Sequence, residues 1–390
     1  MIRKLYLQKA KESPIRRLHP WIFPKAIAKD TGNCVTGELV DVYGADETFI
    51  GVGVYNEHSL YRVRLLAYAF EPLDCSSLAN ILSYRFLKAK RLRENLQLPH
   101  LKTNAYRLLN SEGDGLSGLT IDRFNDVAVV SSSAFWVEAH KTLICELIKE
   151  HLSINEIVWL SDEKTLAQDG WKNELPKVTP SSADVLESGI TYQVNFASTQ
   201  KTGLFLDQRE NHERIGSIAK GKRVLDLYTY TGGFALHAAK NGAVKVTAID
   251  SSSDAIALAK KNAMLNDVNF IEFIEGDARD YLAKASEYDL VVLDPPKLVP
   301  SHKHLERAKN YYRFLHREVF KAMQSGSILL TCNCSSALDA VTFTELVSAQ
   351  ALAASKMVRI LGVFGPASCH PTLSVFKEGQ YLTALLLAVN

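Results

Sequence analysis

Long apolar runs, paired cysteines and a dinucleotide-type glycine turn are all missing from this 390-residue chain. No apolar run approaches the roughly 20 residues that a helix needs to cross a bilayer, so we expect no membrane segment. The six cysteines include no CxxC pair and no Cys/His set with zinc spacing. Scattered cysteines without a signal peptide indicate free thiols, a cytoplasmic location and no bound metal.

An excess of charge of one sign is also absent, because the formal charge is only +2. The distribution is more informative than the total. Before Asp30 the chain has eight Lys or Arg residues and a single acid, Glu12, and a second basic cluster runs from Arg85 to Arg93. Basic stripes of this kind suit a phosphate backbone, although for any single run a solvated surface is the simpler interpretation.

The order of the predicted elements divides the chain into three domains. Residues 1–72 are predicted to form a small β-rich domain, in which Gly51 and Gly53 indicate a bulge or a close backbone approach. Residues 73–190 form a central α+β domain. The strands of these two domains are expected at 5–7, 38–43, 49–55, 61–66, 119–122, 127–131 and 156–160.

The central domain begins with an amphipathic pattern that predicts a helix over residues 76–96, with much of the second basic cluster on its polar face. A second helical pattern covers residues 137–152. Between them, the strands at 119–122 and 127–131 are expected to pair around the turn residues Asn125-Asp126.

Residues 191–390 alternate between strand and helix, which is typical of a parallel sheet. The last strand, at 381–387, is expected at the edge of this sheet. The preceding strands are predicted at 223–227, 245–249, 270–274, 290–293 and 327–331, and the helices at 234–240, 253–266, 278–285 and 309–323.

An aspartate stands at or just after the end of each of the first four strands: Asp226, Asp250, Asp277 and Asp294. Ligands of open α/β sheets bind beyond the carboxyl ends of the strands. An acid after the second strand can accept hydrogen bonds from ribose hydroxyls, and one after the third from an adenine amino group. The turn at Gly232-Gly233 is not GxGxxG, which argues against a dinucleotide dehydrogenase and leaves another nucleotide-like cofactor.

The segment from Asp226 to Phe234, with Asp250, Asp277 and Asp294-Pro-Pro-Lys297, resembles class I S-adenosylmethionine-dependent methyltransferases. Upstream, Thr202-Gly-Leu-Phe-Leu-Asp-Gln-Arg209 resembles a signature of the bacterial rRNA large-subunit methyltransferase I family. That resemblance implies an N-terminal PUA-like β-barrel, a central domain and a C-terminal Rossmann-like methyltransferase domain with a mostly parallel sheet. It also implies large-subunit rRNA as the partner and cytosine C5 as the methylated atom.

The cofactor-binding residues that we predict lie mainly in the turn and at the strand ends. Tyr228, Tyr230 and Phe205 are candidate aromatic walls, with core packing as the alternative. Arg209 is a candidate for the cofactor carboxylate or an RNA phosphate, with a structural salt bridge as the alternative. The predicted set is Asp226, Tyr228, Thr229, Gly232, Gly233, Phe234, Asp250, Asp277, Asp294, Arg209 and Phe205.

Two further residues are predicted to carry the chemistry. The segment Thr331-Cys-Asn-Cys-Ser-Ser336 leaves a strand near the cofactor edge and resembles the family's Cys-Ser catalytic motif, which selects Cys334 as nucleophile and leaves Cys332 to packing. If the register is off by two, their roles exchange. C5 of cytosine is a poor nucleophile until a thiolate adds to C6. The resemblance gives Asp294 the role of hydrogen-bonding the N3/amino edge of the base.

Two other functions remain open from the sequence. Asp-Pro-Pro also resembles motifs used to methylate exocyclic amino groups, a reaction that needs no cysteine nucleophile. A non-catalytic RNA-binding factor in ribosome assembly is a further alternative, because fold alone does not establish catalysis. A homodimer is left open as well.

Overall fold

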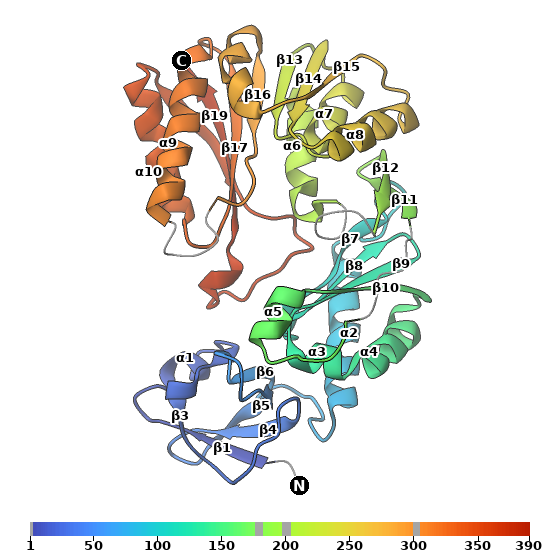
Figure 1. Ribbon diagram of the computed structural model, residues 1–390, viewed down its shortest axis with the longest axis vertical. Coiled ribbons are helices and arrows are strands. Elements are labelled where there is room, and N and C mark those ends of the chain that lie inside the picture. The colour runs from blue at the N-terminus through green and yellow to red at the C-terminus, as the bar shows by residue number, and fades with distance from the viewer. Residues whose placement is uncertain (1–2, 176–181, 197–203, 299–304) are drawn as a thin grey trace. The chain divides into compact units, whose positions relative to one another are not determined.

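The computed structural model describes residues 3–175, 182–196, 204–298 and 305–390 (Figure 1). The chain divides into two compact units. The N-terminal unit comprises Met1–Ala183, Val194–Gly203 and Cys369–Gly379, and the C-terminal unit comprises Asp184–Gln193, Leu204–Ser368 and Gln380–Asn390. The hairpin of β11 (Ser182–Glu187) and β12 (Ile190–Asn195) spans the division. None of the helices in the described ranges has the length and hydrophobicity needed to span a membrane.

The N-terminal unit begins with a six-stranded sheet in the order β2-β6-β5-β4-β1-β3. The predicted bulge is confirmed, because the register between β5 and β6 shifts at Val52/Gly53. A Cβ on Gly51 would collide with the Ala67 carbonyl oxygen, so the neighbouring strand leaves no room for a side chain. The strands are β1 (Arg3–Leu7), β2 (Trp21–Ile22), β3 (Ile27–Asp30), β4 (Leu39–Tyr43), β5 (Phe49–Tyr55) and β6 (Val63–Tyr68), with α1 (Ser13–Arg16) and the 3₁₀ turn η1 (Pro24–Ala26) between them.

The helix predicted over residues 76–96 is α2 (Leu78–Asn95), and Ser77 caps it by accepting a hydrogen bond from Asn80 N at 3.1 Å. The prediction that the second basic cluster lies on its solvated face is wrong for two residues. Arg85 is buried against Glu71, with Nη2 to Oε2 at 2.6 Å, and Arg93 is fully buried against Asp114, with Nη1 to Oδ1 at 2.7 Å. Both guanidinium groups can be buried because each is paired with a carboxylate.

A four-stranded sheet, β10-β9-β8-β7, packs beside α2. The predicted hairpin is confirmed, because Phe124 pairs with Val127 and the two-residue turn places Asn125 at a φ of 56°. The predicted helix over 137–152 is broken at His140 into shorter pieces. The elements are β7 (Ala105–Asn110), η2 (Ser111–Asp114), β8 (Leu119–Phe124), β9 (Val127–Ser132), α3 (Phe135–Ala139), α4 (Lys141–Leu147), the π-helix η3 (Ile148–Leu152), β10 (Glu156–Ser161) and α5 (Glu163–Gln168).

Polar side chains join the two sheets of the N-terminal unit. Trp21 Nε1 and Arg64 Nη1 both donate to Ser117 Oγ, at 3.0 and 2.8 Å. Asn56 Nδ2 donates to the Asp169 carbonyl oxygen at 2.9 Å. These hydrogen bonds are mostly buried. Residues 1–70 and the residues around the central sheet therefore share one polar interface.

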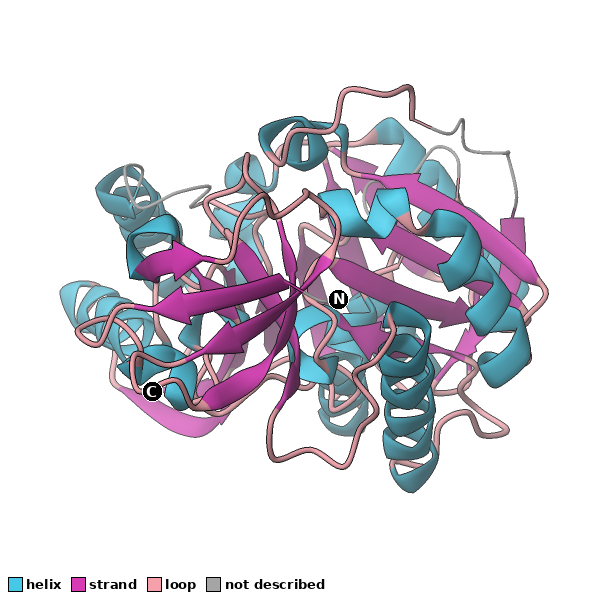
Figure 2. Cartoon of the chain, turned by 90° about the horizontal axis from the view of Figure 1, so that it is seen from below, coloured by secondary structure: helices cyan, strands magenta, loops and turns pink. Residues whose placement is uncertain are grey.

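The C-terminal unit contains a seven-stranded sheet in the order β15-β14-β13-β16-β17-β19-β18. Figure 1 labels most of its strands, and Figure 2 shows the strands and helices of the chain in separate colours. The first five strands in this order are parallel, and β19 pairs antiparallel with both β17 and β18. The expectation of an edge strand at 381–387 is therefore wrong, because β18, which the sequence pattern did not reveal, covers that edge. The strands are β13 (Arg223–Leu227), β14 (Lys245–Asp250), β15 (Ile271–Glu275), β16 (Leu290–Leu293), β17 (Ile328–Cys334), β18 (Val358–Phe364) and β19 (Leu382–Val389).

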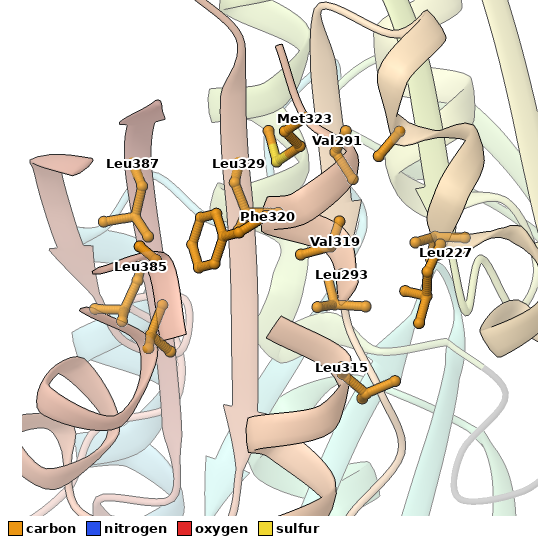
Figure 3. Close-up of a cluster of buried hydrophobic side chains, with 14 of the residues drawn as sticks. Leu227, Val291, Leu293, Leu315, Val319, Phe320, Met323, Leu329, Leu385 and Leu387 are labelled. Carbon is orange, nitrogen blue, oxygen red and sulfur yellow. The ribbon is translucent and has the colours of Figure 1, made fainter. Parts of the chain in front are cut away.

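One face of this sheet packs against η5, α9 and α10, and its core is drawn in Figure 3. Leu227, Leu293 and Leu329 point into this core from adjacent strands, and Leu315 and Phe320 meet them from α9. Because strand side chains alternate, Asp226, Cys332 and Cys334 point to the opposite face. The described helical elements of the C-terminal unit are η4 (Leu206–Gln208), α6 (Arg209–Ile218), α7 (Gly233–Lys240), α8 (Ser253–Leu265), η5 (Ala278–Glu287, 3₁₀), α9 (Leu305–Ala322) and α10 (Ala340–Ala353). The short helix η7 (Lys377–Gly379) belongs to the N-terminal unit.

Candidate active site

The turn between β13 and α7 has an unusual backbone. Gly232 has a φ of 90°, in the left-handed region that favours glycine. Tyr228 and Tyr230 also have positive φ, at 68° and 52°, which is uncommon for residues with large side chains. Strain of this kind tends to persist at ligand sites, where the surrounding structure fixes it. A Cβ on Gly232 would lie 3.4 Å from Leu236 and 3.5 Å from Ala259, so the left-handed backbone, and not a lack of space, favours glycine here.

Asp226 lies beneath this turn and is fully buried. Its Oδ2 accepts hydrogen bonds from Thr229 Oγ1 at 2.5 Å and from Ala235 N at 3.1 Å. Its Oδ1 is buried with no hydrogen-bond partner among the described residues. Burial raises the pKa of Asp226 to about 6. The carboxyl group thus fixes the shape of the turn through Oδ2, while Oδ1 accepts no hydrogen bond from the described residues.

Asp250 and Asp277 stand at the ends of the next two strands. The Asp250 carboxylate accepts from Tyr230 N at 2.9 Å and from Ser252 N at 3.0 Å, so the second strand end is tied to the turn. Asp277, predicted to meet an adenine amino group, is paired with Arg279, whose Nε lies 2.8 and 2.9 Å from its two oxygens. The hydrogen bond from Arg279 lowers the pKa of Asp277.

The predicted aromatic walls have two different surroundings. Phe205 and Tyr230 are half-buried and meet edge to face, with ring centroids 4.9 Å apart. Tyr228 packs against the core on the other face of the sheet, and its hydroxyl lies 3.4 Å from that of Tyr311. Phe234 is buried, and its ring meets that of His212 edge to face with the centroids 4.5 Å apart. Phe205 and Tyr230 are therefore the better placed of these rings to meet a ligand.

Asp294 and Cys334 are brought together from β16 and β17. Cys334 Sγ lies 3.9 Å from Asp294 Oδ1, and Gln208 Nε2 donates to Asp294 Oδ2 at 2.9 Å. Asn211 Nδ2 in turn donates to Gln208 Oε1 at 2.6 Å, which fixes the orientation of the Gln208 amide. The predicted pair is thus adjacent, and η4 supplies a third member that the sequence did not single out.

The electrostatics of this group separate the two cysteines. Burial, reinforced by Asp207 and Asp226, raises the pKa of Asp294 to about 7. Burial and the nearby Asp294 raise the pKa of the fully buried Cys332 well above its usual range. Cys334 is the last residue of β17 and is only half-buried. A thiol with a raised pKa is a poor nucleophile at neutral pH, which disfavours Cys332.

Arg209 is the first residue of α6 and is buried. Its Nη2 lies 3.4 Å from Glu210 Oε1, so Arg209 forms a salt bridge, the predicted alternative to a ligand contact. Arg209 directly follows Gln208 in the sequence, so its guanidinium group is a candidate for a ligand contact as well as for the salt bridge with Glu210.

A buried cluster behind the turn was not foreseen from the sequence. Glu187 Oε1 lies 2.7 Å from His212 Nδ1 and 3.6 Å from His237 Nε2, and their potential metal-ligand atoms all lie within 4.8 Å of one another. Burial of Glu187 acts to raise its pKa, but the charges and hydrogen bonds of the two histidines lower it to about 2. A Cβ on Gly233 would lie 2.5 Å from His212 Nε2, so the cluster packs directly against the turn.

Comparisons with known proteins identify the molecule's relatives. Residues 169–361 match a family model described as S-adenosylmethionine-dependent methyltransferase, and residues 5–68 match one described as a PUA-like domain. Ribosomal RNA large subunit methyltransferase I of Alteromonas mediterranea is 34% identical over the full length of both chains. The protein of that name from Aeromonas hydrophila is 33% identical over 99% of each. The chain belongs to the ribosomal RNA large subunit methyltransferase I family.

The solved structures agree on the fold. A putative S-adenosylmethionine-dependent methyltransferase from Streptococcus mutans is 21% identical, with a TM-score of 0.80 over 99% of this chain and 100% of that one. SMU.776, a putative methyltransferase complexed with SAH, superposes with a TM-score of 0.82 and the same coverage. The predicted Rossmann-like methyltransferase fold and the PUA-like domain are confirmed.

S-adenosylmethionine is the cofactor of this methyltransferase I family member, and the site residues suit it. Asp250 is held at the end of the second strand, where ribose hydroxyls are bound in such folds. Gly232 supplies the left-handed backbone of the turn that leads into α7, and Asp226 Oδ1 is an acceptor without a partner in the described part of the chain.

Proposed function

We propose that this protein methylates C5 of a cytosine in large-subunit rRNA, with Cys334 as covalent nucleophile. The RNA class is suggested by relatives with this name and full-length coverage, together with the PUA-like domain. The observation that carries the reaction is the 3.9 Å approach of Cys334 Sγ to Asp294 Oδ1 at the carboxyl edge of the sheet. Methylation of an exocyclic amino group would have no use for this thiol.

In the proposed reaction the Cys334 thiolate forms a bond to C6 of the cytosine. The electron pair of the C5–C6 double bond then makes C5 nucleophilic. S-adenosylmethionine, when bound, would supply the methyl group that C5 takes, and breaking of its sulfur–methyl bond would leave S-adenosylhomocysteine. A base removes the C5 proton, the C5–C6 double bond re-forms, and the thiolate leaves C6. The base to be methylated must be unpaired or turned out of its helix to reach Cys334.

Asp294 is proposed to hydrogen-bond N3 of the cytosine. Its pKa of about 7 makes the protonated carboxyl available near neutral pH, so that it can donate to N3 as charge builds on the ring. Because Gln208 donates to Oδ2, the proton of the neutral acid belongs on Oδ1, the oxygen that faces Cys334. Gln208 is therefore a positioning residue for Asp294.

We also propose that the three predicted domains divide the task. Residues 1–72 and 73–190 would hold the RNA, and residues 191–390 would bind the cofactor and carry out the reaction. The proposed cofactor contacts are Asp250 and Asp277 at the strand ends, the Asp226–Phe234 turn, and Phe205 and Arg209 from the preceding segment.

A mechanism-based trap tests the covalent step. RNA in which the target cytosines carry fluorine at C5 has no C5 proton to lose, so the adduct should persist as a protein–RNA species that survives SDS. We expect this species with the wild type and none with Cys334→Ala. Bisulfite mapping of rRNA from cells with and without the protein identifies the target. An intact protein that methylates RNA without forming the adduct would contradict the proposal.

A further inference from the structure

Aromatic rings and lysines gather on the outward face of the N-terminal sheet. The rings of Tyr6 and Tyr43 are stacked, with centroids 5.4 Å apart and planes at 26°, and Phe49 lies 5.5 Å beyond Tyr43. Lys29 Nζ stands 4.7 Å from the Tyr6 centroid and Lys4 Nζ stands 5.2 Å from that of Tyr43. We refer to these five residues as the Tyr–Lys face.

Strand alternation explains why the rings are not in the core. Leu5, Val40 and Val42 are buried in the hydrophobic cluster of this sheet. Their neighbours Lys4, Tyr6 and Tyr43 therefore point away from it. The register places Tyr6 opposite both Tyr43 and Lys29, so the row forms across β3, β1, β4 and β5 without side chains having to reach far.

The face remains accessible within the N-terminal unit. Lys4 and Lys29 are exposed, Phe49 has 40% of its surface exposed, and the two tyrosines are half-buried. One acid, Asp41, shares the face and pairs in register with Lys4; burial raises its pKa, and Lys4 opposes that shift. The two lysines outnumber this acid, so the face has a net positive charge.

We infer that the Tyr–Lys face binds an unpaired segment of RNA. This inference rests on the proposed RNA substrate. Bases stack on aromatic side chains whatever their identity, and cations beside the rings contact the phosphates that link them. Phe49 is the most exposed ring of the row and offers a surface to a base, and Lys4 and Lys29 flank the stack. Bases inside an RNA duplex are already stacked, so the face suits a single strand better.

The binding of a fluorescent 12-nucleotide oligouridine to the full-length protein tests the rings. Tyr43→Ala and Phe49→Ala should each weaken binding by about tenfold, since stacking contributes about 1–3 kcal/mol per base. Tyr43→Phe should bind like the wild type, because stacking needs only the ring. Phe70→Ala is the matched control: Phe70 is 70% exposed and stacks on Tyr68 at 5.9 Å, outside the Tyr–Lys face.

The salt dependence of the same binding tests the lysines. Replacing Lys4 and Lys29 by Gln should reduce the slope of log K against log salt by about 1.4, at about 0.7 per phosphate contact on a single strand. Gln at the exposed Lys102 and Lys172 should leave the slope unchanged. A duplex of the same length should bind wild type and ring variants with equal affinity.

Unchanged oligouridine affinity in both Tyr43→Ala and Phe49→Ala would overturn this inference. If Tyr43→Ala fails to fold, as judged by its melting curve, the exposed Phe49 decides the outcome. Because oligouridine contains no cytosine, its binding is independent of the proposed reaction. Loss of binding in the ring variants of an enzyme that methylates no cytosine would refute the proposed function and leave the Tyr–Lys face standing.

Discussion

Gln208 donates from Nε2 to Oδ2 of Asp294 over 2.9 Å, while its own Oε1 is held by Asn211. This bond connects the segment before α6 with the end of β16. It leaves Oδ1 of Asp294 directed to Cys334. The chemistry that we propose depends on this arrangement as well as on the Asp294 carboxyl group and the Cys334 thiol themselves.

The first prediction concerns the two cysteines. Cys334→Ala should abolish methyl transfer while S-adenosylmethionine binding, measured by calorimetry, survives. Cys332→Ala should keep most of the activity and lower stability by roughly 1 kcal/mol, because it removes a small buried side chain. Full activity in Cys334→Ala with loss in Cys332→Ala would show that the roles are exchanged.

The second prediction concerns Gln208. Its hydrogen bond lowers the pKa of Asp294, opposing the larger effect of burial. Gln208→Ala should therefore raise that pKa and move the alkaline decline of kcat to higher pH, as well as reducing kcat. Asn211→Ala should shift the profile in the same direction by less. A lower kcat with an unmoved pH profile would indicate a structural effect only.

The third prediction links Asp294 to stability. Its folded pKa of about 7 exceeds the ordinary value of 3.8, so the folded protein holds a proton that the unfolded chain has lost. The contribution of Asp294 to the free energy of unfolding should consequently decrease as pH rises from about 4 to 7. Asp294→Asn stays neutral, so it should be inactive but melt higher than the wild type at pH 8 and similarly at pH 4. A lower melting temperature at pH 8 would contradict this.

The fourth prediction has the opposite sign. The pKa of Glu187 is lowered to about 2, so its contribution to stability is present above pH 4.5 and is lost as the pH falls towards 2. Glu187→Gln should lower the melting temperature at pH 7 and approach the wild type near pH 3. Glu345→Gln, at an exposed position on α10, should have little effect at either pH. Equal losses at both pH values would point to packing instead.

The fifth prediction compares two arginines of α2. Arg93 is fully buried and reaches Asp114 and the Cys369 carbonyl oxygen, the latter at 2.7 Å, whereas Arg91 is exposed. Arg93→Ala should destabilise the protein by about 3–5 kcal/mol because it leaves Asp114 buried without its partner. Arg91→Ala should change the free energy of unfolding by less than about 0.5 kcal/mol. Urea unfolding distinguishes the two.

Local patterns in the sequence were sufficient for much of the fold. Strand–helix alternation predicted the parallel strands β13 to β17, and apolar spacing with a serine cap predicted α2. The acids after strands were predicted to share one edge because parallel strands end on the same side. These inferences need only neighbours in sequence and the periods of helix and strand.

Longer-range contacts decided the rest. β19 is an internal strand because β18 pairs with it, from Val358 with Val389 to Phe364 with Ala384, so the paired residues are 31 to 20 positions apart in the sequence. In the sequence, Arg85 and Arg93 cannot be distinguished from surface cations, because only the fold brings Glu71 and Asp114 beside them. The Glu187–His212–His237 cluster comes from three separate segments and has no spacing that a sequence reader could recognise.

The sequence by itself determined that this protein is an α/β methyltransferase with an acid at each of four strand ends and a cysteine near them. Those features are set by residue type and strand period. Only the tertiary structure decided that Cys334 is half-buried beside Asp294 and Cys332 is fully buried, and that Gln208 orients the acid. Burial and the pKa values that follow from it depend on everything packed around a residue, which no local pattern specifies.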